Sequence, residues 1–350
     1  MAGMTRFERS ALLAAAVLTA LAGVANHGGW APVPRFAAAT GALAGVAWLV
    51  SFATEEVGEH LGPGRTGFLQ ASLANLPELF VVIFALNAGE LVVAQTALVG
   101  SLLANALLLL GVVIVVGARR APDGVMRFSR QLPNDVTTLL LIAVFLIVIL
   151  GLSLSSGDPA GRHAQAISVV GAGCLLVVYA VWLVPQLRSA SGGESGPSRI
   201  GLGRALVLLV LGGVGAVFVS EWFVNALRPA IDALGVSPAF AGLVIVAIAG
   251  NAVEHAASIV LAARGRSDLA ISVVKSSVAQ IAAFLFPVLV LISLALSTQL
   301  TFALAPVYIG ALALMTIAVW QVTGDGEASA FEGLALAAIY VILAVVAAYQ

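Results

Sequence analysis

Charged residues are scarce in this chain of 350 residues, of which only 9% are Asp, Glu, Lys or Arg. Soluble domains carry about 25% charged residues, so this composition excludes a soluble globular protein. Cysteine is equally scarce, because Cys174 stands alone and excludes both an internal disulfide framework and a thiolate metal site. The formal net charge of −1 excludes the basic surface of a nucleic-acid-binding protein. Hydrophobic residues make up 61% of the chain, which predicts a polytopic membrane protein with the lipid bilayer as its partner.

Eleven apolar segments are long enough to form a bilayer-spanning helix, which needs about 20 residues. They occupy approximately residues 9–25, 36–53, 66–87, 91–116, 135–154, 164–185, 203–227, 239–263, 269–296, 299–320 and 328–349. The alternating ten-residue pattern of a transmembrane β-barrel is absent. The sequence therefore predicts an all-α polytopic membrane protein. We interpret the first segment as a retained helix, with a cleaved signal peptide as the alternative.

The distribution of arginine predicts the orientation of these spans. Twelve of the 16 basic residues fall on the side of the N-terminus, and three fall in the opposite loops. Because positively charged loops stay in the cytoplasm, we expect a cytoplasmic N-terminus and, after eleven spans, a C-terminus outside. We expect the protein in a prokaryotic cell (inner) membrane.

The longest polar break, residues 186–202, is rich in Ser and Gly and predicts a flexible cytoplasmic linker. It separates a first five-helix repeat at 36–185 from a second at 203–350, with an extra N-terminal helix at 1–30. An odd number of spans in each half makes the two halves enter the membrane from opposite sides. This is the inverted-repeat plan of many secondary transporters.

Matching polar residues in the two halves support the repeat. Three pairs are separated by the same 176 positions, namely Asn75 and Asn251, Glu78 and Glu254, and Ser101 and Ser277. A constant offset over two helices and their connecting loop is hard to obtain by chance. The sequence therefore predicts that the two halves place equivalent side chains at equivalent positions.

Glu78 and Glu254 lie inside apolar spans, where a charge costs at least about 2.5–3.5 kcal/mol and usually marks an ion or proton path. Asn75 and Asn251 each precede a glutamate by three residues and share its helix face. A pseudo-two-fold would bring two carboxylates and two amides together at the midplane, a set of hard oxygen ligands that suits Ca²⁺. Two nearby carboxylates also resist simultaneous ionisation, so protons would compete with the cation for them. This competition is the physical basis of an exchanger.

For other polar residues of these spans, the sequence gives weaker support for a role in cation binding. Gln280 follows Ser277 by three residues and Asn105 follows Ser101 by four, so each can face the site, as a ligand or as a supporting residue. The two serines can equally be helix-packing residues. Pro77 can kink its helix and free a carbonyl for a cation, or it can serve packing alone.

These motifs resemble a known family. The run Gly250-Asn251-Ala252-Val253-Glu254-His255, followed by Ser276-Ser277-Val278-Ala279-Gln280, resembles the second repeat of the calcium/cation antiporter superfamily, and Asn75 to Gly111 resembles the first. The chain is most similar to the cation/proton exchanger branch, over residues 45–115 and 215–295. The resemblance implies an antiporter of ten core helices plus one, in which Glu78 and Glu254 bind Ca²⁺ and protons alternately. No cofactor is implied besides the transported ions.

Lys275, the one lysine of the chain, departs from the family pattern, which has an apolar residue there. Its ammonium either extends to the inner interface or approaches the carboxylates as a built-in cation. His255, next to Glu254, either handles protons or packs as a hydrogen-bonded side chain.

Acidic residues gather at the inner end of the second span. Glu55, Glu56 and Glu59 form either a solvated helix end or a cytoplasmic vestibule that attracts cations. Glu221 lies near the expected outer mouth and is a candidate for the outward path.

Three alternative functions compete with Ca²⁺/H⁺ exchange. Sodium-coupled or monovalent cation exchange within the same superfamily is favoured by Pro77 and Lys275, because both depart from the proton-coupled pattern. A passive cation channel is a second alternative. An intramembrane enzyme would need a nucleophile with its base, or a metal triad, and the four histidines are scattered, so we expect no enzyme.

Overall fold

The computed structural model describes residues 4–61, 73, 75–190 and 199–350. The beginning of the predicted third span and residues 191–198 of the predicted linker at 186–202 lie outside these residues.

The chain divides into two compact units. The first unit comprises Met1–Ala85, Ala180–Pro238 and Ala249–Val253, and the second comprises Leu86–Tyr179, Ala239–Ile248 and Glu254–Gln350. The boundary runs between Val253 and Glu254, so the second of the two sequence motifs contributes residues to both units.

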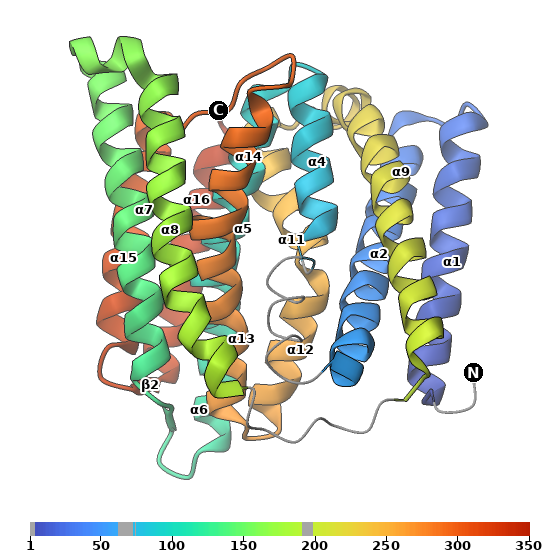
Figure 1. Ribbon diagram of the computed structural model, residues 1–350, viewed down its shortest axis with the longest axis horizontal. Coiled ribbons are helices and arrows are strands. Elements are labelled where there is room, and N and C mark those ends of the chain that lie inside the picture. The colour runs from blue at the N-terminus through green and yellow to red at the C-terminus, as the bar shows by residue number, and fades with distance from the viewer. Residues whose placement is uncertain (1–3, 62–72, 74, 191–198) are drawn as a thin grey trace. The chain divides into compact units, whose positions relative to one another are not determined.

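Three long helices form most of the first unit: α1 (Arg6–His27), α2 (Pro32–Leu61) and α9 (Leu202–Leu234). Figure 1 shows them running side by side. Small residues allow the close approach of α1 and α2, since a Cβ built on Gly45 would lie 3.0 Å from the Cα of Ala15. Most of α4 (Leu76–Asn87) also belongs to this unit.

The second unit is an assembly of helices with one small two-stranded sheet. Its strands β1 (Val125–Arg127) and β2 (Glu327–Ser329) pair antiparallel, with Met126 opposite Ala328. Besides the end of α4, the helices that lie wholly or partly in this unit are α5 (Leu91–Leu103), η1 (Ala104–Leu109), α6 (Leu110–Arg120), α7 (Gln131–Ser156), η2 (Pro159–His163), α8 (Ala164–Ala190), α10 (Pro238–Phe240), η3 (Ala241–Val246), α11 (Ala247–Gly250), α12 (Ala252–Ala263), α13 (Ser267–Gln280), η4 (Ile281–Leu285), α14 (Phe286–Ser293), α15 (Pro306–Thr323) and α16 (Ala330–Ala348).

Nine helices in the described part of the chain are long and apolar enough to cross a membrane, and a bent pair, Pro238–Gly250 with Ala252–Ala263, makes ten. The shorter apolar helix α4 corresponds to the end of the predicted span 66–87. The predicted beginning of the span 299–320 is wrong. Helix α15 begins at Pro306, because proline favours the first helical turn. Helix α16 agrees with the predicted span 328–349 to within two residues, and the Ser329–Glu332 capping box starts it directly after β2.

The internal repeat is visible in the elements themselves. Helices α4 and α12 each have 12 residues, and their first residues, Leu76 and Ala252, are 176 positions apart. The same offset separates the beginnings of α5 and α13, and α13 continues through the π-helix η4 as α5 continues through η1. The sequence repeat therefore corresponds to a repeat of local structure.

Candidate cation site

In the first unit, the candidate residues surround the beginning of α4. Asn75 forms a turn directly before the helix, and Glu78 lies in its first turn. Both are buried, with exposed fractions of 9% and 4%. The buried hydroxyl of Ser220 on α9 donates to the carbonyl oxygen of Pro77 at 3.2 Å, which ties the start of α4 to α9. Asn251, 3% exposed, belongs to the same unit.

The chain bends by 60° between Gly250 and Ala252, with Asn251 at the break. Gly250 is the last residue of α11, directly before this break, and Pro77 lies in the first turn of α4, directly after the turn at Asn75. A helix interrupted at this point has backbone groups without intrahelical partners, and such groups can serve a cation where they line a cavity. Asn251 thus occupies the same local position as Asn75, because each is the turn residue directly before the first residue of a helix.

In the second unit, the hydroxyl of Ser277 on α13 lies beside the carboxyl of Glu254. Glu254 as a whole keeps some exposure, but its Oε2 is buried. This atom has no hydrogen-bond partner within the described residues. The carboxylate oxygen is therefore available to a bound ion or proton.

Ser258 is a further candidate, which the motifs in the sequence did not indicate. It follows Glu254 by four residues on α12, so it lies on the same helix face. Its side chain is completely buried, and its Oγ has no hydrogen-bond partner among the residues described. The i, i+4 spacing was a signal that could have identified it.

The other predicted polar residues of the second unit lie around the π-helices. Ser101 and Asn105 are completely buried, and Asn105 Nδ2 donates to the Ser101 carbonyl oxygen at 3.0 Å. The π-helix η1 begins three residues after Ser101, and η4 begins directly after Gln280, which is partly buried. Single-turn π segments occur frequently at functional sites, and their presence after both serine motifs was not predicted.

Gly100 has a clear packing role. A Cβ at this position would lie 2.5 Å from the Cα and carbonyl oxygen of Leu243 in η3. Helix α5 and η3 therefore approach as closely as two backbones can. Tyr340 on α16 adds a hydrogen bond from its hydroxyl to the Leu243 carbonyl oxygen at 3.2 Å. The serine helix of the first repeat is thus fixed against η3 one residue before Ser101.

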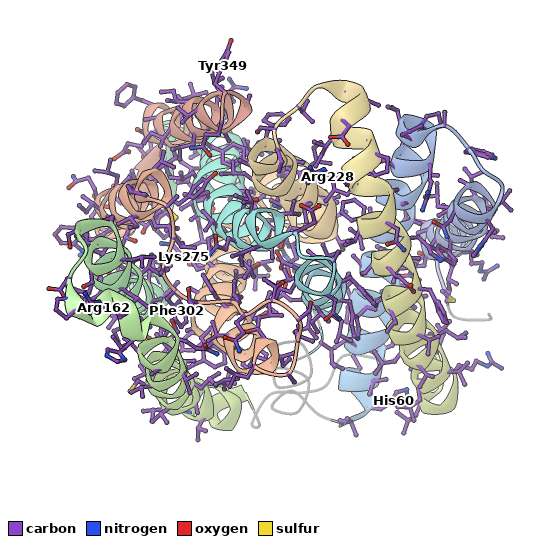
Figure 2. The ribbon with its side chains drawn as sticks, turned by 90° about the horizontal axis from the view of Figure 1, so that it is seen from above. His60, Arg162, Arg228, Lys275, Phe302 and Tyr349 are labelled. Atoms are coloured by element: carbon purple, nitrogen blue, oxygen red, sulfur yellow. The ribbon has the colours of Figure 1, made fainter. Side chains whose placement is uncertain are left out.

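Lys275 is buried, with 1% of its surface exposed, and its Nζ donates to Thr323 Oγ1 on α15 at 3.0 Å. Figure 2 shows it among the helices of the second unit, whereas Tyr349 points away from them. The ammonium is therefore not in solvent, as extension to the interface would require. Within the described residues it also forms no ion pair, so it does not contact Glu254. His255 is partly buried, and its Nε2 has no hydrogen-bond partner in the described chain.

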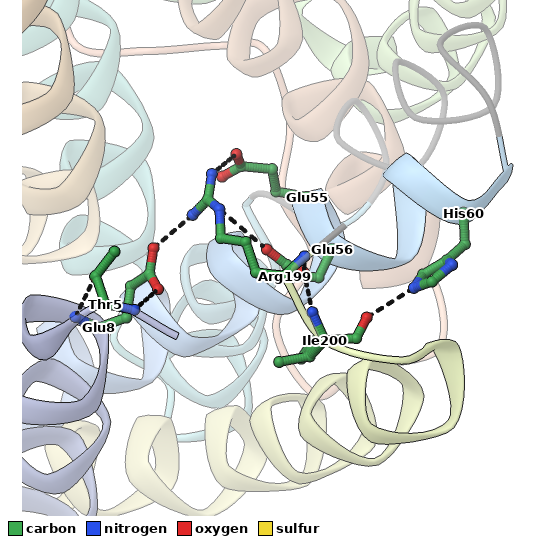
Figure 3. Close-up of polar contacts among 7 residues, drawn as sticks. All are labelled: Thr5, Glu8, Glu55, Glu56, His60, Arg199 and Ile200. Carbon is green, nitrogen blue, oxygen red and sulfur yellow. Dashed lines mark hydrogen bonds and ion pairs between the residues drawn. The ribbon is translucent and has the colours of Figure 1, made fainter. Parts of the chain in front are cut away.

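The acidic residues at the end of α2 surround one arginine (Figure 3). Arg199 Nη1 lies 2.6 Å from Glu8 Oε1 on α1, and Arg199 Nη2 lies 3.1 Å from Glu55 Oε1. Its Nε lies 3.6 Å from Glu56 Oε1. Partial burial works against the charged form of the guanidinium, but the three carboxylates raise the pKa of Arg199 above its ordinary value. We call these four residues the Arg199 cluster.

Glu56 is completely buried and is not part of a solvated helix end. Its Oε2 accepts hydrogen bonds from the backbone N–H groups of Arg199 and Ile200, at 3.0 and 3.1 Å. Glu59 is partly buried, and Glu221 is exposed on α9. Glu55 and Glu56 therefore bind the segment before α9 in this structure, and a role of the acidic residues in attracting cations stays a prediction.

No group of three or more His, Cys, Asp or Glu side chains in the described part of the chain could hold a metal ion. The candidate residues instead combine one carboxylate per repeat with amide and hydroxyl oxygens. Carboxylate and neutral oxygens are the ligands that Ca²⁺ accepts in flexible numbers and geometries. The sets suit a transported hard cation, and their pairing across the two repeats stays a prediction.

Known proteins resemble this chain over nearly its full length. The chain is 27% identical to a Ca²⁺/H⁺ antiporter of Aphanothece halophytica over 90% of both proteins. It is 31% identical to the vacuolar calcium ion transporter of Schizosaccharomyces pombe, over 86% of this chain and 76% of that protein. The solved structure of native YfkE has a TM-score of 0.82 and 26% identity, covering 97% of this chain and all of the other.

These similarities confirm the predicted all-α polytopic membrane fold, with which the inverted repeat is consistent. They also confirm the predicted resemblance, since several curated relatives are named Ca²⁺/H⁺ antiporters or cation/proton exchangers. The sequence model of the family described as sodium/calcium exchanger protein matches residues 33–188 and 204–349, which include both motifs. The chain is therefore a member of the sodium/calcium exchanger protein family.

Proposed function

We propose that this protein is a secondary transporter that exchanges Ca²⁺ for protons across the membrane. One observation carries the proposal: each repeat places an asparagine in a turn and a glutamate in the first turn of a following 12-residue apolar helix. The relatives named Ca²⁺/H⁺ antiporters, which match along most of the chain, support the choice of ions.

In the proposed mechanism, Glu78 and Glu254 bind the cation together and release it when protons replace it. Asn75 and Asn251 supply amide oxygens, and the hydroxyls of Ser101 and Ser277 complete the set. Neutral ligands contribute coordination without adding charge, so protonation of the two glutamates removes the charge that holds a divalent ion. Alternating access then exposes the same oxygens to one side of the membrane with Ca²⁺ and to the other with protons.

Ca²⁺ uptake into proteoliposomes tests the proposal. The purified full-length chain should accumulate ⁴⁵Ca when a pH gradient is imposed, and absence of uptake by the wild-type protein would contradict the proposal. Glu78→Gln and Glu254→Gln should each abolish exchange, because glutamine keeps the shape but loses the charge and the titratable proton. Asp232→Asn is a matched control, since Asp232 is exposed near the end of α9.

The driving ion needs its own experiment, because the matched family is described as sodium/calcium exchangers. Replacing the pH gradient by a Na⁺ gradient in the same liposomes should give no ⁴⁵Ca uptake. Uptake driven by Na⁺ and not by protons would support the sodium-coupled alternative. A cation current across a bilayer in the absence of both a pH gradient and a Na⁺ gradient would support a passive channel.

A further inference from the structure

An apolar groove of about 360 Å³ lies between the beginning of α1 and the beginning of α9, within the first unit. Met4 and Leu12 line it from the N-terminal side, and Ile200, Val207 and Leu208 line it from the segment leading into α9. Among the described residues that line the groove, Arg204 is the one that carries a charge. An apolar channel that ends at a guanidinium matches an amphipathic ligand.

The helices that form this groove face outward over much of their length. Only 17% of the apolar window of α1 and 22% of that of α9 are buried. Val207, in the groove, is 58% exposed, and Leu13, next to the groove residue Leu12, is 67% exposed. In a membrane protein such surfaces face lipid, so an acyl chain can reach the groove directly from the bilayer.

The arginines at this end of the unit differ in their partners. Arg199 is held by the three carboxylates of the Arg199 cluster. Arg204 is exposed, and its side chain has no ion pair or side-chain hydrogen bond with any residue that the structure describes. Val207 and Leu208 follow it by three and four residues, so the guanidinium and the apolar lining share one face of α9. The charge is therefore placed at the groove itself, one turn before Val207 and Leu208, where it can meet an external anion.

Two further arginines lie on the helix that forms the other side of the groove. Arg6 and Arg9 are exposed on the first turns of α1, and Arg9 precedes the groove residue Leu12 by three positions. Helix α9 begins after Gly201 without a side-chain cap, so its first N–H groups add a partial positive charge. The arginine distribution predicts that this end lies on the cytoplasmic side, where lipid headgroups carry negative charge.

We propose that this groove binds one anionic phospholipid of the cytoplasmic leaflet. The acyl chain lies along the apolar lining between α1 and α9, and the headgroup phosphate pairs with Arg204. Such a lipid bridges the N-terminal helix and α9 beside the Arg199 cluster. The site is separate from the proposed cation ligands, and transport activity is not needed to detect it.

Native mass spectrometry of the detergent-solubilised full-length protein tests the proposal, with dioleoyl-phosphatidylglycerol and dioleoyl-phosphatidylcholine as probes. The wild-type protein should retain one phosphatidylglycerol in preference to phosphatidylcholine. Arg204→Gln should weaken this binding about fivefold, the size expected for one basic residue at a charged membrane surface. Arg119→Gln is the matched control, because Arg119 is also exposed at a helix end but lies outside the groove.

A second variant tests the apolar part of the site. A Cβ on Gly203 meets nothing within 4 Å, and Gly203 lines the groove, so Gly203→Leu fills it while keeping Arg204. This variant should lose phosphatidylglycerol without losing thermal stability. Unchanged binding by Arg204→Gln, or by Gly203→Leu, would overturn the proposal. Displacement of the lipid by millimolar inorganic phosphate would also overturn it, since the site would then bind a free anion.

Discussion

Lys275 and Thr323 form a buried polar pair whose energetic coupling can be measured. Nζ of Lys275 donates to Thr323 Oγ1 at 3.0 Å, and Thr323 Oγ1 donates to the Val319 carbonyl oxygen at 2.7 Å. Both side chains are 1% exposed. Thr323→Val keeps the shape of the side chain but removes the acceptor. It leaves the buried ammonium of Lys275 without its acceptor, which should lower the unfolding free energy by about 3 kcal/mol, the size expected for a charged group.

The double variant should recover much of this loss. Lys275→Met removes the charge that needs an acceptor, and Thr323 keeps its bond to Val319. Replacing both partners by apolar groups of similar shape is close to neutral. We therefore expect the unfolding free energy to fall by about 1 kcal/mol both in the single variant Lys275→Met and in the double variant with Thr323→Val. The coupling energy of this double-mutant cycle is then about 3 kcal/mol.

Thermal unfolding in detergent measures these differences. With an unfolding entropy of about 2.1 cal/mol/K per residue, 3 kcal/mol lowers the Tm of a 350-residue chain by roughly 4 °C. The double variant should unfold within about 2 °C of the wild type. A Thr323→Val protein with the wild-type Tm, or a double variant whose Tm falls by the sum of the single changes, would refute the reasoning. Either result would mean that the ammonium of Lys275 does not depend on Thr323.

Three further predictions concern packing, the Arg199 cluster and the site hydroxyls. Gly100→Ala should lower the unfolding free energy by about 1–3 kcal/mol, because the added Cβ would lie 2.5 Å from the Leu243 backbone. The control Gly310→Ala, whose Cβ meets no atom within 4 Å, should leave the unfolding free energy unchanged or raise it by up to about 1 kcal/mol. Thermal unfolding (Tm) measures both changes. Arg199→Gln should lower the unfolding free energy by about 1–3 kcal/mol, which is less than for a fully buried ion pair because the Arg199 side chain is 36% exposed. In 1 M salt the variant should still be less stable than the wild type by most of this amount. Ser258→Ala should leave Tm unchanged or raise it, because the hydroxyl has no hydrogen-bond partner among the described residues. The same variant should raise KM for Ca²⁺ in the transport assay. A fall in Tm with an unchanged KM would contradict a place for Ser258 in the cation site.

The sequence predicted the class of fold and the repeat, because both depend on local signals. Apolar length identifies a spanning helix wherever it packs, and the offset between Asn75 and Asn251 is visible without any contact. The beginning of the span 299–320 was missed because it depends on Pro306, which stands within a continuous apolar pattern.

Long-range pairs were beyond prediction from one sequence. Glu55 and Glu56 are neighbours of equal chemistry, yet one is partly exposed and the other is completely buried against the backbone of Arg199 and Ile200, more than 140 residues away. Helical rotation by about 100° per residue separates them, but only the packing of α9 decides which face is covered. The same holds for Lys275, whose partner Thr323 lies 48 residues further along the chain.

The two repeats coincide in their helix boundaries but differ in what fixes their serine helices. Positions 99 and 100 in the first repeat correspond, at the offset of 176, to Lys275 and Ser276 in the second. The first helix uses Gly100 to bring its backbone against Leu243, a contact of shape alone. The second uses a buried ammonium that reaches Thr323 on the opposite side of its helix from Ser277, since residues two apart do not share a face. Two serines at equivalent positions are therefore supported by different forces, one steric and one polar. Removal of the Thr323 hydroxyl should therefore loosen the second helix, and addition of a methyl group at position 100 should displace the first.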